Sequence, residues 1–370
     1  MAPPRLPPEL IHDVAGEILL RIPPDESAHL FRASLVCDLW FHVATDPAFR
    51  RRYRAFHPSA PLLGFFYNRL LAPSPCFVST TAASPLPEGA SVPRASSVLD
   101  CRVLLTKKGS RNLLVWDPIT DGWWELQEPD VLSFYSAVVL CAVAGCNHHD
   151  CRSGPFLVVC VATDDRCSGI RACVYSSESR AWGKPASAHL GRVPFTVIER
   201  AALIGDGIYW TVVGGCRILK YDLVKHCFSL INPPDMCYKE GPVLMQNEDG
   251  SLGLAGVRDS RLYLWSRMVN PERVSTGWVQ QRVIDLEKIL PRNKGFNQAN
   301  VIGFAEGVAL LFIGTKVDTF TFELNSERVK KVSGPRKSSS IFPFISFCTP
   351  DCARIKVPLQ AEELTTVPEE

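Results

Sequence analysis

The chain has 370 residues, of which 46% are hydrophobic and 21% charged, a composition typical of a folded globular protein rather than a disordered one. Its 40 basic and 38 acidic side chains leave a formal net charge of +2, which gives no electrostatic basis for binding nucleic acid or a membrane surface. The length is enough for one small and one large domain. Any partner is therefore expected to be recognised by shape rather than by net charge.

The N-terminus and the cysteines bear on location. Met1–Pro8 holds four prolines and no apolar core, so we expect no signal peptide, and no apolar run approaches the roughly 20 residues of a membrane span. Without a route to an oxidising compartment, the 14 cysteines are expected to be reduced, several of them as small buried hydrophobes such as Cys141 and Cys160. The sequence predicts a soluble protein of the cytoplasm, the nucleus or both.

Residues 5–58 follow a helical period and form the first predicted domain. Prolines 7 and 8 suit the opening of a helix, and Pro23 and Pro24 end it. Asp25 is the expected N-cap of a second helix, and Asp46-Pro47 begins a third that ends at Pro58. The apolar faces of these three predicted helices comprise Leu10, Ile11, Val14 and Ile18, then Leu30, Ala33, Cys37, Trp40, Phe41 and Ala44, then Phe49, Tyr53 and Phe56.

Such a small helical unit buries little surface by itself. Leu19 and Leu20 widen the apolar arc of the first helix beyond what one internal core is expected to cover. Periodicity alone favours two readings equally: either the surplus binds another protein, or the helices pack on the rest of the chain.

The sequence predicts mainly β-strands in the remainder of the chain. Residues 59–97 form a connecting segment that includes candidate blade-closing strands and is rich in Pro, Ser and Ala from Ala72 to Ser97. Residues 98–350 form an all-β domain and residues 351–370 a tail. Short β-rich runs such as "NLLVW", "GIYWTVV" and "VALLFI" are separated by Gly, Asn, Asp or Pro. We therefore expect an α plus all-β multidomain protein.

A hairpin phrase recurs in the β region, as in "LLVWDPITDGWWEL" and "ILKYDLVKHCFSLI". The equivalent aromatic positions lie 59, 46, 44 and 57 residues apart, and periods of this size indicate propeller blades. These positions are Trp116, Tyr175, Tyr221, Trp265 and Phe322.

The predicted fold is a kelch-like β-propeller of five to six blades. Gly214-Gly215 ahead of a Tyr-Asp hairpin favours the kelch style. A sixth blade is expected to join "LLGFF" (62–66) and "CFVST" (76–80) to "IFPFISF" (341–347), because such a blade closes the ring and removes open sheet edges. A two-sheet sandwich is the alternative, although a sandwich needs no internal repeat.

Candidate chemistry is sparse. The segment 141–151 offers six metal-ligating side chains, but their spacing matches no known zinc pattern, so an exposed loop is favoured over a metal site. No nucleophile elbow, phosphate loop, HExxH or dinucleotide-binding motif is present, so we expect a non-enzymatic protein with no cofactor and no metal. The six side chains belong to Cys141, Cys146, His148, His149, Asp150 and Cys151.

Two further clusters have ordinary interpretations. We expect the four arginines near the end of the third helix to lie on its solvated face rather than to bind a phosphate or an acidic partner. They are Arg50, Arg51, Arg52 and Arg54. The Trp123-Trp124 pair must point to opposite sides of its strand, which places at least one ring in the core. Trp116-Asp117 lacks the Gly-His partner of a WD repeat and reads as a hairpin entering its turn.

The N-terminal 60 residues resemble the F-box of the large grass F-box family. The matching phrases are "EILLRIPP" (17–24), "RASLVC" (32–37), Trp40, "DPAFRRRYRAFH" (46–57) and "PLLGFF" (61–66). The β region is similar to the F-box-associated domain of that family through "GPFLVV", "GIYWTVVGGCRILKYDL", "SLGLAGVRDSRLYLWSR" and "VIGFAEG". The resemblance covers nearly the whole chain and favours docking over self-packing.

The resemblance implies a substrate receptor of an SCF-type E3 ubiquitin ligase, with a three-helix F-box on a SKP-type adaptor held by a cullin. The β domain would bind an unknown target protein; the alternative is a scaffold that recruits no degradation target. The family usually has lysine and arginine where this chain has Asp38 and Phe41, which puts adaptor affinity in doubt. The implied adaptor-binding residues are Leu10, Ile11, Ile18, Leu19, Leu20, Ile22, Pro23, Leu35, Val36, Cys37 and Trp40.

Overall fold

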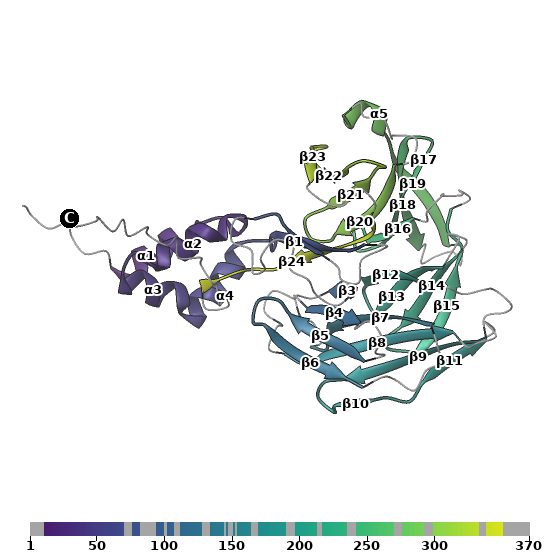
Figure 1. Cartoon of the computed structure of the whole chain (residues 1–370), viewed down its shortest axis with the longest axis horizontal. Helices are drawn as coiled ribbons and strands as arrows, with labels where there is room; N and C mark the ends of the chain where they lie inside the picture. The colour runs from purple at the N-terminus through teal and green to yellow at the C-terminus, as the bar shows by residue number, and fades with distance from the viewer. Residues whose placement is uncertain are drawn as a thin grey trace, which may run out of the picture.

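The computed structural model joins a short helical segment to a β-propeller (Figure 1). No helix in the described part of the chain is long and apolar enough to cross a membrane. The structure describes residues 11–69, 76–81, 94–99, 102–106, 112–127, 134–143, 146, 151, 154–163, 169–189, 197–212, 217–234, 242–269, 276–291, 299–332 and 338–350.

The helical segment contains four α-helices and one 3₁₀ turn, not the three helices that the sequence predicts. They are α1 (His12–Leu20), η1 (Pro24–Glu26), α2 (Ser27–Ser34), α3 (Asp38–Thr45) and α4 (Pro47–Phe56).

The second predicted helix is two helices because the chain becomes extended at Cys37 (φ −162°, ψ 165°). The last turn of α2 tightens, since the N–H groups of Leu35 and Val36 donate to carbonyls three residues back. The Ser34 hydroxyl also donates to the Phe31 carbonyl, a local bond that competes with helix continuation. Asp38 then opens α3, where its negative charge suits the helix N-terminus.

Six antiparallel sheets follow in the described residues, and we number them as blades. Every neighbouring strand pair in them is antiparallel, and the strands run consecutively in blades 1 to 5. Blade 1 holds β3 (Arg94–Leu99), β4 (Arg102–Thr106), β5 (Leu113–Asp117) and β6 (Gly122–Leu126); blade 2 β7 (Phe134–Cys141), β8 (Phe156–Thr163), β9 (Gly169–Ser176), β10 (Ala181–Trp182) and β11 (Ala186–His189); blade 3 β12 (Val197–Ile204), β13 (Gly207–Val212), β14 (Ile218–Asp222) and β15 (Cys227–Ile231); blade 4 β16 (Val243–Gln246), β17 (Leu252–Arg258), β18 (Arg261–Val269) and β19 (Thr276–Asp285); blade 5 β20 (Asn300–Ala305), β21 (Leu310–Gly314), β22 (Thr319–Glu323) and β23 (Val329–Val332); and blade 6 β24 (Ser338–Ile345), β1 (Leu62–Arg69) and β2 (Cys76–Ser79). A short helix, α5 (Leu286–Ile289), follows β19.

Blade 6 confirms the predicted ring closure, because β1 from the start of the β region pairs with β24 from its end. The innermost strands contact one another in the order β24, β3, β7, β12, β16, β20 and back to β24. The propeller therefore begins at Leu62, so part of the predicted connecting segment 59–97 belongs to it, and β3 starts four residues before the predicted boundary at 98.

The sequence repeat is also confirmed. The five predicted equivalent aromatics all lie on the third strand of their blades, namely Trp116 on β5, Tyr175 on β9, Tyr221 on β14, Trp265 on β18 and Phe322 on β22. The sandwich alternative is thereby excluded. Gly214-Gly215, on which the kelch style depends, lies outside the described residues, so that style stays a prediction.

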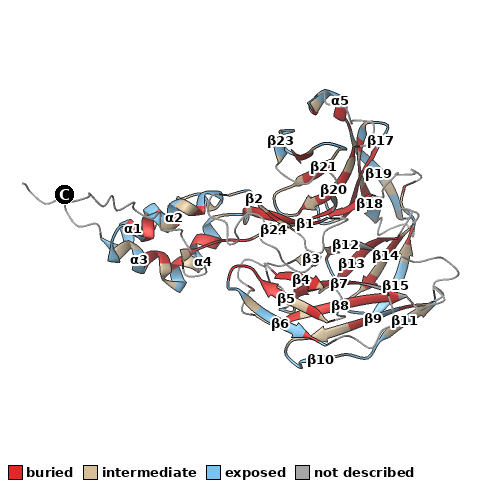
Figure 2. Cartoon of the chain, in the orientation of Figure 1, coloured by how far each residue is buried: buried red, intermediate tan, exposed pale blue. Residues whose placement is uncertain are grey.

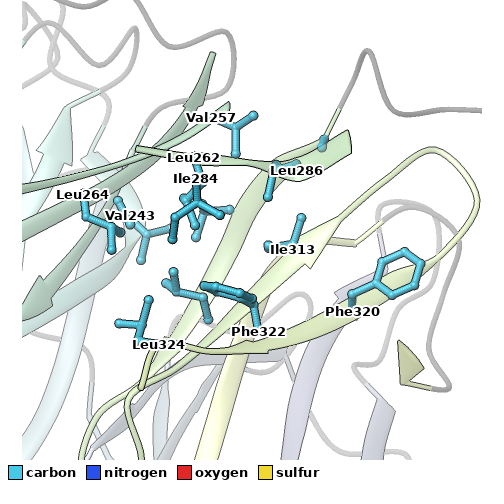
Figure 3. Packing of buried hydrophobic residues seen from close by; sticks show 14 of the residues in the cluster. Val243, Val257, Leu262, Leu264, Ile284, Leu286, Ile313, Phe320, Phe322 and Leu324 are labelled. Atoms are coloured by element: carbon cyan, nitrogen blue, oxygen red, sulfur yellow. The ribbon is translucent and has the colours of Figure 1, made fainter. Parts of the chain in front are cut away.

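Six apolar clusters fill the six gaps between neighbouring blades. The cluster between blades 4 and 5 brings Leu262 and Ile284 against Ile313 and Phe322 (Figure 3). Inner strands are covered on both faces, which explains why runs such as Gly207–Val212 are buried at every position instead of at alternate ones. Each blade is thus held by its two neighbours, and burial of this apolar surface is the main favourable term.

Candidate functional site

The helical segment has an apolar core of its own, separate from the six clusters between blades. Leu19 and Leu20 lie inside it, together with Leu30, Val43 and Tyr53. The Tyr53 hydroxyl donates to the Ile22 carbonyl at 2.8 Å, and the His57 ring Nε2 lies 3.0 Å from the Leu20 carbonyl oxygen. Burial raises the pKa of the Tyr53 phenol, and the charge of Asp25 adds to the effect.

The outer surface of the helical segment is unusually apolar. Seven of the fifteen large hydrophobic side chains that are exposed in the described residues lie within residues 11–56. The propeller, with many more residues, supplies the other eight. Red and pale-blue stretches alternate along these helices in Figure 2. The seven are Ile11, Val14, Ile18, Leu35, Val36, Phe41 and Phe56.

Two groups stand out on this surface. Ile11, Val14 and Ile18 are spaced three and four residues apart and therefore share one face of α1. Leu35 and Val36, in the connection between α2 and α3, are 76% and 69% exposed. These two adjacent side chains form a small exposed apolar patch on the helical segment.

The residues that the resemblance predicts at an adaptor surface differ in their exposure to solvent. Leu19 and Leu20 lie in the internal core, which leaves them 0% and 2% exposed. Ile22 and Trp40 are half-buried against that core, and Leu10 lies outside the described residues. The remaining six are exposed: Ile11, Ile18, Pro23, Leu35, Val36 and Cys37.

Sequence reasoning missed one contribution and misjudged another. Val14, predicted only on the apolar face of the first helix, is exposed on the same side as Ile18. Phe41, predicted on the apolar face of the second helix, is 47% exposed, so its ring adds apolar area to the surface.

The C-terminal end of β24 ties the helical segment to the propeller. Phe347 is fully buried in the helical core, with its ring centroid 6.3 Å from that of Tyr53. The Ser346 N–H donates to the Pro61 carbonyl at 3.1 Å, and Phe31 of α2 packs on the cluster between blades 6 and 1. Two chain segments and a shared core therefore hold the helices at one end of the propeller (Figure 1).

A cavity of about 460 Å³ lies beside this junction. Its wall includes the inner strands of five blades and the connection from α4 to β1. Arg200 and Glu306 contribute charged side chains, while most of the wall is apolar or carries small polar groups. The cavity has the size and mixed lining of a site that takes a few side chains of a peptide or a small ligand. Its other wall residues include Ala60, Ser97, Val98, Gln246, Phe304 and Phe347.

Three of the cysteines of the segment 141–151 come together, and Cys141, predicted to be buried in a strand, is the half-buried last residue of β7. The sulfur atoms of Cys141, Cys146 and Cys151 lie within 4.8 Å of one another, with Cys151 buried and the other two half-buried. Burial is the largest of the effects that raise the pKa of the Cys141 thiol. His148, His149 and Asp150 lie outside the described residues.

The two other predicted clusters need correction. Arg51 and Arg52 lie on the solvated face of α4, where Arg52 pairs with Glu17, but Arg54 is buried and Arg50 is half-buried. Trp123 and Trp124 are both exposed, because β6 is the outermost strand of its blade and both of its sides reach solvent. The Trp123 ring stacks on Trp116 at 5.0 Å, at the turn that Asp117 caps.

No known family model matches the chain, and no curated protein matches it. Among solved structures, the chain is similar to one in a nidogen/laminin complex (12% identity, 77% of this chain, 99% of that chain, TM-score 0.43). It is also similar to the β-propeller domain of Cps50 (Swd1) from Myceliophteria_thermophila (10% identity, 76% of this chain, 88% of that chain, TM-score 0.41). A third similar structure is that of a functionally unknown protein from Desulfotomaculum acetoxidans (13% identity, 73% of this chain, 78% of that chain, TM-score 0.40). The propeller assignment rests on the strand pairing and the six inter-blade clusters.

Proposed function

We propose that the protein is the substrate receptor of an SCF-type E3 ubiquitin ligase. The helical segment acts as an F-box that binds a SKP-type adaptor and, through it, a cullin, and the propeller binds the target protein. The receptor carries out no bond chemistry. It raises the effective concentration of the target near the ubiquitin-charged enzyme.

The observation that carries this proposal is the exposure of Leu35 and Val36. Both lie in the "RASLVC" phrase that resembles the F-box, and neither contributes to the internal core of the helices. Covering a side chain of this kind contributes about 1.5–3 kcal/mol. Cys37 follows directly and is exposed as well.

The two departures from the family pattern fit the same surface. Asp38 is exposed in the first turn of α3, where its charge stabilises the helix end. Phe41 replaces a positive charge with an exposed ring. We expect adaptor binding to depend more on apolar burial, and less on salt, than in relatives that carry both positive charges.

The adaptor interaction is tested with the full chain and a purified SKP-type adaptor. The double substitution Leu35→Asp/Val36→Asp is expected to weaken the complex at least about 100-fold, since two apolar contacts worth about 3–6 kcal/mol together are lost. The free protein keeps its stability because both side chains are solvent-exposed.

The matched control is Val224→Asp in the β14–β15 turn, because Val224 is 69% exposed, as Val36 is, but lies on the propeller. It should leave adaptor affinity unchanged. Equal affinity of the double variant and the wild type, measured by titration calorimetry, would contradict the proposal. Leu19→Asp is unsuitable for this purpose, because it puts a charge into the core of the helices.

For the target we propose the cavity at the junction. Gln246→Trp narrows it from an exposed position on its wall, whereas His189→Trp adds the same ring to the distant strand β11. Affinity capture with mass spectrometry should recover proteins with the wild type and His189→Trp that Gln246→Trp fails to retain. Identical captured proteins for all three would place the target site elsewhere.

The same captured proteins separate a receptor from an F-box scaffold. Targets of a receptor accumulate when the cullin ligase is inhibited, because their degradation stops. If adaptor binding holds but no captured protein accumulates, the scaffold alternative is correct.

A further inference from the structure

Blade 2 carries a group of thiols that the proposed receptor function does not use. Cys141 is the last residue of β7, and Cys146 and Cys151 follow in the connection to β8. Their three sulfur atoms lie within 4.8 Å of one another. Among the described residues, no other three His, Cys, Asp or Glu side chains converge in this way.

The spacing of the sulfurs is close to that of a metal site. Zinc binds thiolate sulfur at about 2.3 Å with tetrahedral angles, which places bound sulfurs about 3.8 Å apart. Sulfurs already within 4.8 Å reach that spacing by movements of about 1 Å or less. Ordinary rotation of cysteine side chains supplies such movements without a change in the strands.

Hydrogen bonds hold the described residues next to the thiols. The Val143 N–H lies 3.4 Å from the Cys141 sulfur and donates to it, a bond that stabilises negative charge there. The Cys146 N–H donates to the Val143 carbonyl, and the Gly154 N–H to the Cys151 carbonyl. The strands on either side are paired from Cys141 and Phe156 onward.

A buried cation supports the same turn. Arg102, on β4 of the neighbouring blade, is 1% exposed, and its Nη2 donates to the carbonyls of Cys151 at 3.1 Å and Gly154 at 2.7 Å. Three thiolates around Zn²⁺ carry a net charge of −1, and a guanidinium bound to the turn that holds the third thiolate offsets this charge. A buried arginine fits an anionic site better than a cluster of neutral thiols.

We propose that Cys141, Cys146 and Cys151 form a zinc site at the end of β7 in blade 2. Three thiolates suit zinc, and the fourth position is open to a further ligand, as in sites with three protein ligands. The site links Cys146 and Cys151 in the connection to Cys141 at the end of β7.

The test measures metal in the full chain, purified under reducing conditions and supplied with Zn²⁺. We expect one equivalent of zinc per chain by native mass spectrometry and elemental analysis. Replacing zinc with Co²⁺ should give the thiolate-to-cobalt charge-transfer band. Cys146→Ser should weaken zinc binding at least about 100-fold, since even loss of an outer-shell partner costs 10–100-fold.

Cys227→Ser is the matched control, because Cys227 is an exposed thiol on blade 3. It should keep the full equivalent of zinc. Cys146 is half-buried in a connection rather than in a strand, so its serine variant is expected to fold; equal thermal unfolding of the two variants in chelator checks this.

Three outcomes would overturn the proposal. The first is no zinc retained at micromolar concentration by the folded wild type, and the second is equal zinc in Cys146→Ser. The third is copper(I) bound in preference to zinc. A disulfide between two of the three cysteines in unreduced protein, with no metal uptake after reduction, counts as the first outcome.

Discussion

The helical segment and the propeller bury apolar side chains in opposite ways. In the propeller, every blade is covered by two neighbours, so the inner strands are apolar on both faces and few large side chains remain outside. The helical segment has one small core and leaves Leu35 and Val36 almost fully open. A closed ring covers the faces of its own strands, whereas a small helical unit leaves part of its apolar surface exposed.

Phe347 joins the two regions through the helical core, and removing its ring should have the largest effect. Phe347→Ala deletes a fully buried ring from the helical core and is expected to cost about 3–5 kcal/mol of that core's stability. The helices should then unfold at lower denaturant than the propeller, and proteases should cut near Pro58. Denaturant unfolding followed by far-ultraviolet circular dichroism measures the separation.

Phe56→Ala is the control, because its ring is exposed at the end of α4. Its effect should stay within about 0.5 kcal/mol. If Phe347→Ala unfolds in one transition with wild-type midpoint, the helical segment does not depend on the propeller.

A smaller effect is expected at the cap of α4. Both carboxylate oxygens of Asp46 accept backbone bonds, from the Ala48 and Phe49 N–H groups at 3.2 and 3.3 Å. Asp46→Ala should cost about 0.5–2 kcal/mol, since two helix-end donors lose their partner. Asp38→Ala removes only a charge near a helix end, so it should lower the free energy of unfolding by less than Asp46→Ala does. Chemical denaturation measures both variants. A larger loss for Asp38→Ala would show that charge outweighs capping in this segment.

The smallest effect concerns a propeller turn and its pH dependence. A bond from the Lys225 N–H, with further help from Lys220 and the Val224 N–H, holds the pKa of Asp222 below its usual 3.8. A lowered carboxyl pKa contributes stability above pH 3.8 that is lost as the pH falls through the folded value. Asp222→Asn should therefore flatten the acid side of the stability curve of the full chain slightly, while the helical segment is unaffected. An unchanged acid limb would rule this contribution out.

Local chemistry in the sequence was enough to predict the blades. Third-strand aromatics such as Trp116 and Tyr221 recur because each blade repeats the same hairpin, and Asp117 and Asp222 cap their turns through contacts two and three residues away. The closing strands around Leu63 and Phe344 were predictable because an open sheet edge is a liability. The N-cap at Asp46 was predictable as well, because its carboxylate bonds to an N–H group only three residues away.

Only the tertiary structure decided which apolar residues of the helices face outward. Periodicity places Leu19 and Ile18 near one another on a helix but does not say which is covered, and the break before Cys37 turned Leu35 and Val36 to solvent. The convergence of Cys141, Cys146 and Cys151 likewise depends on how a connection folds back on its strand. Spacing along a chain determines which residues share a face; what covers that face is set by contacts between segments far apart in the sequence.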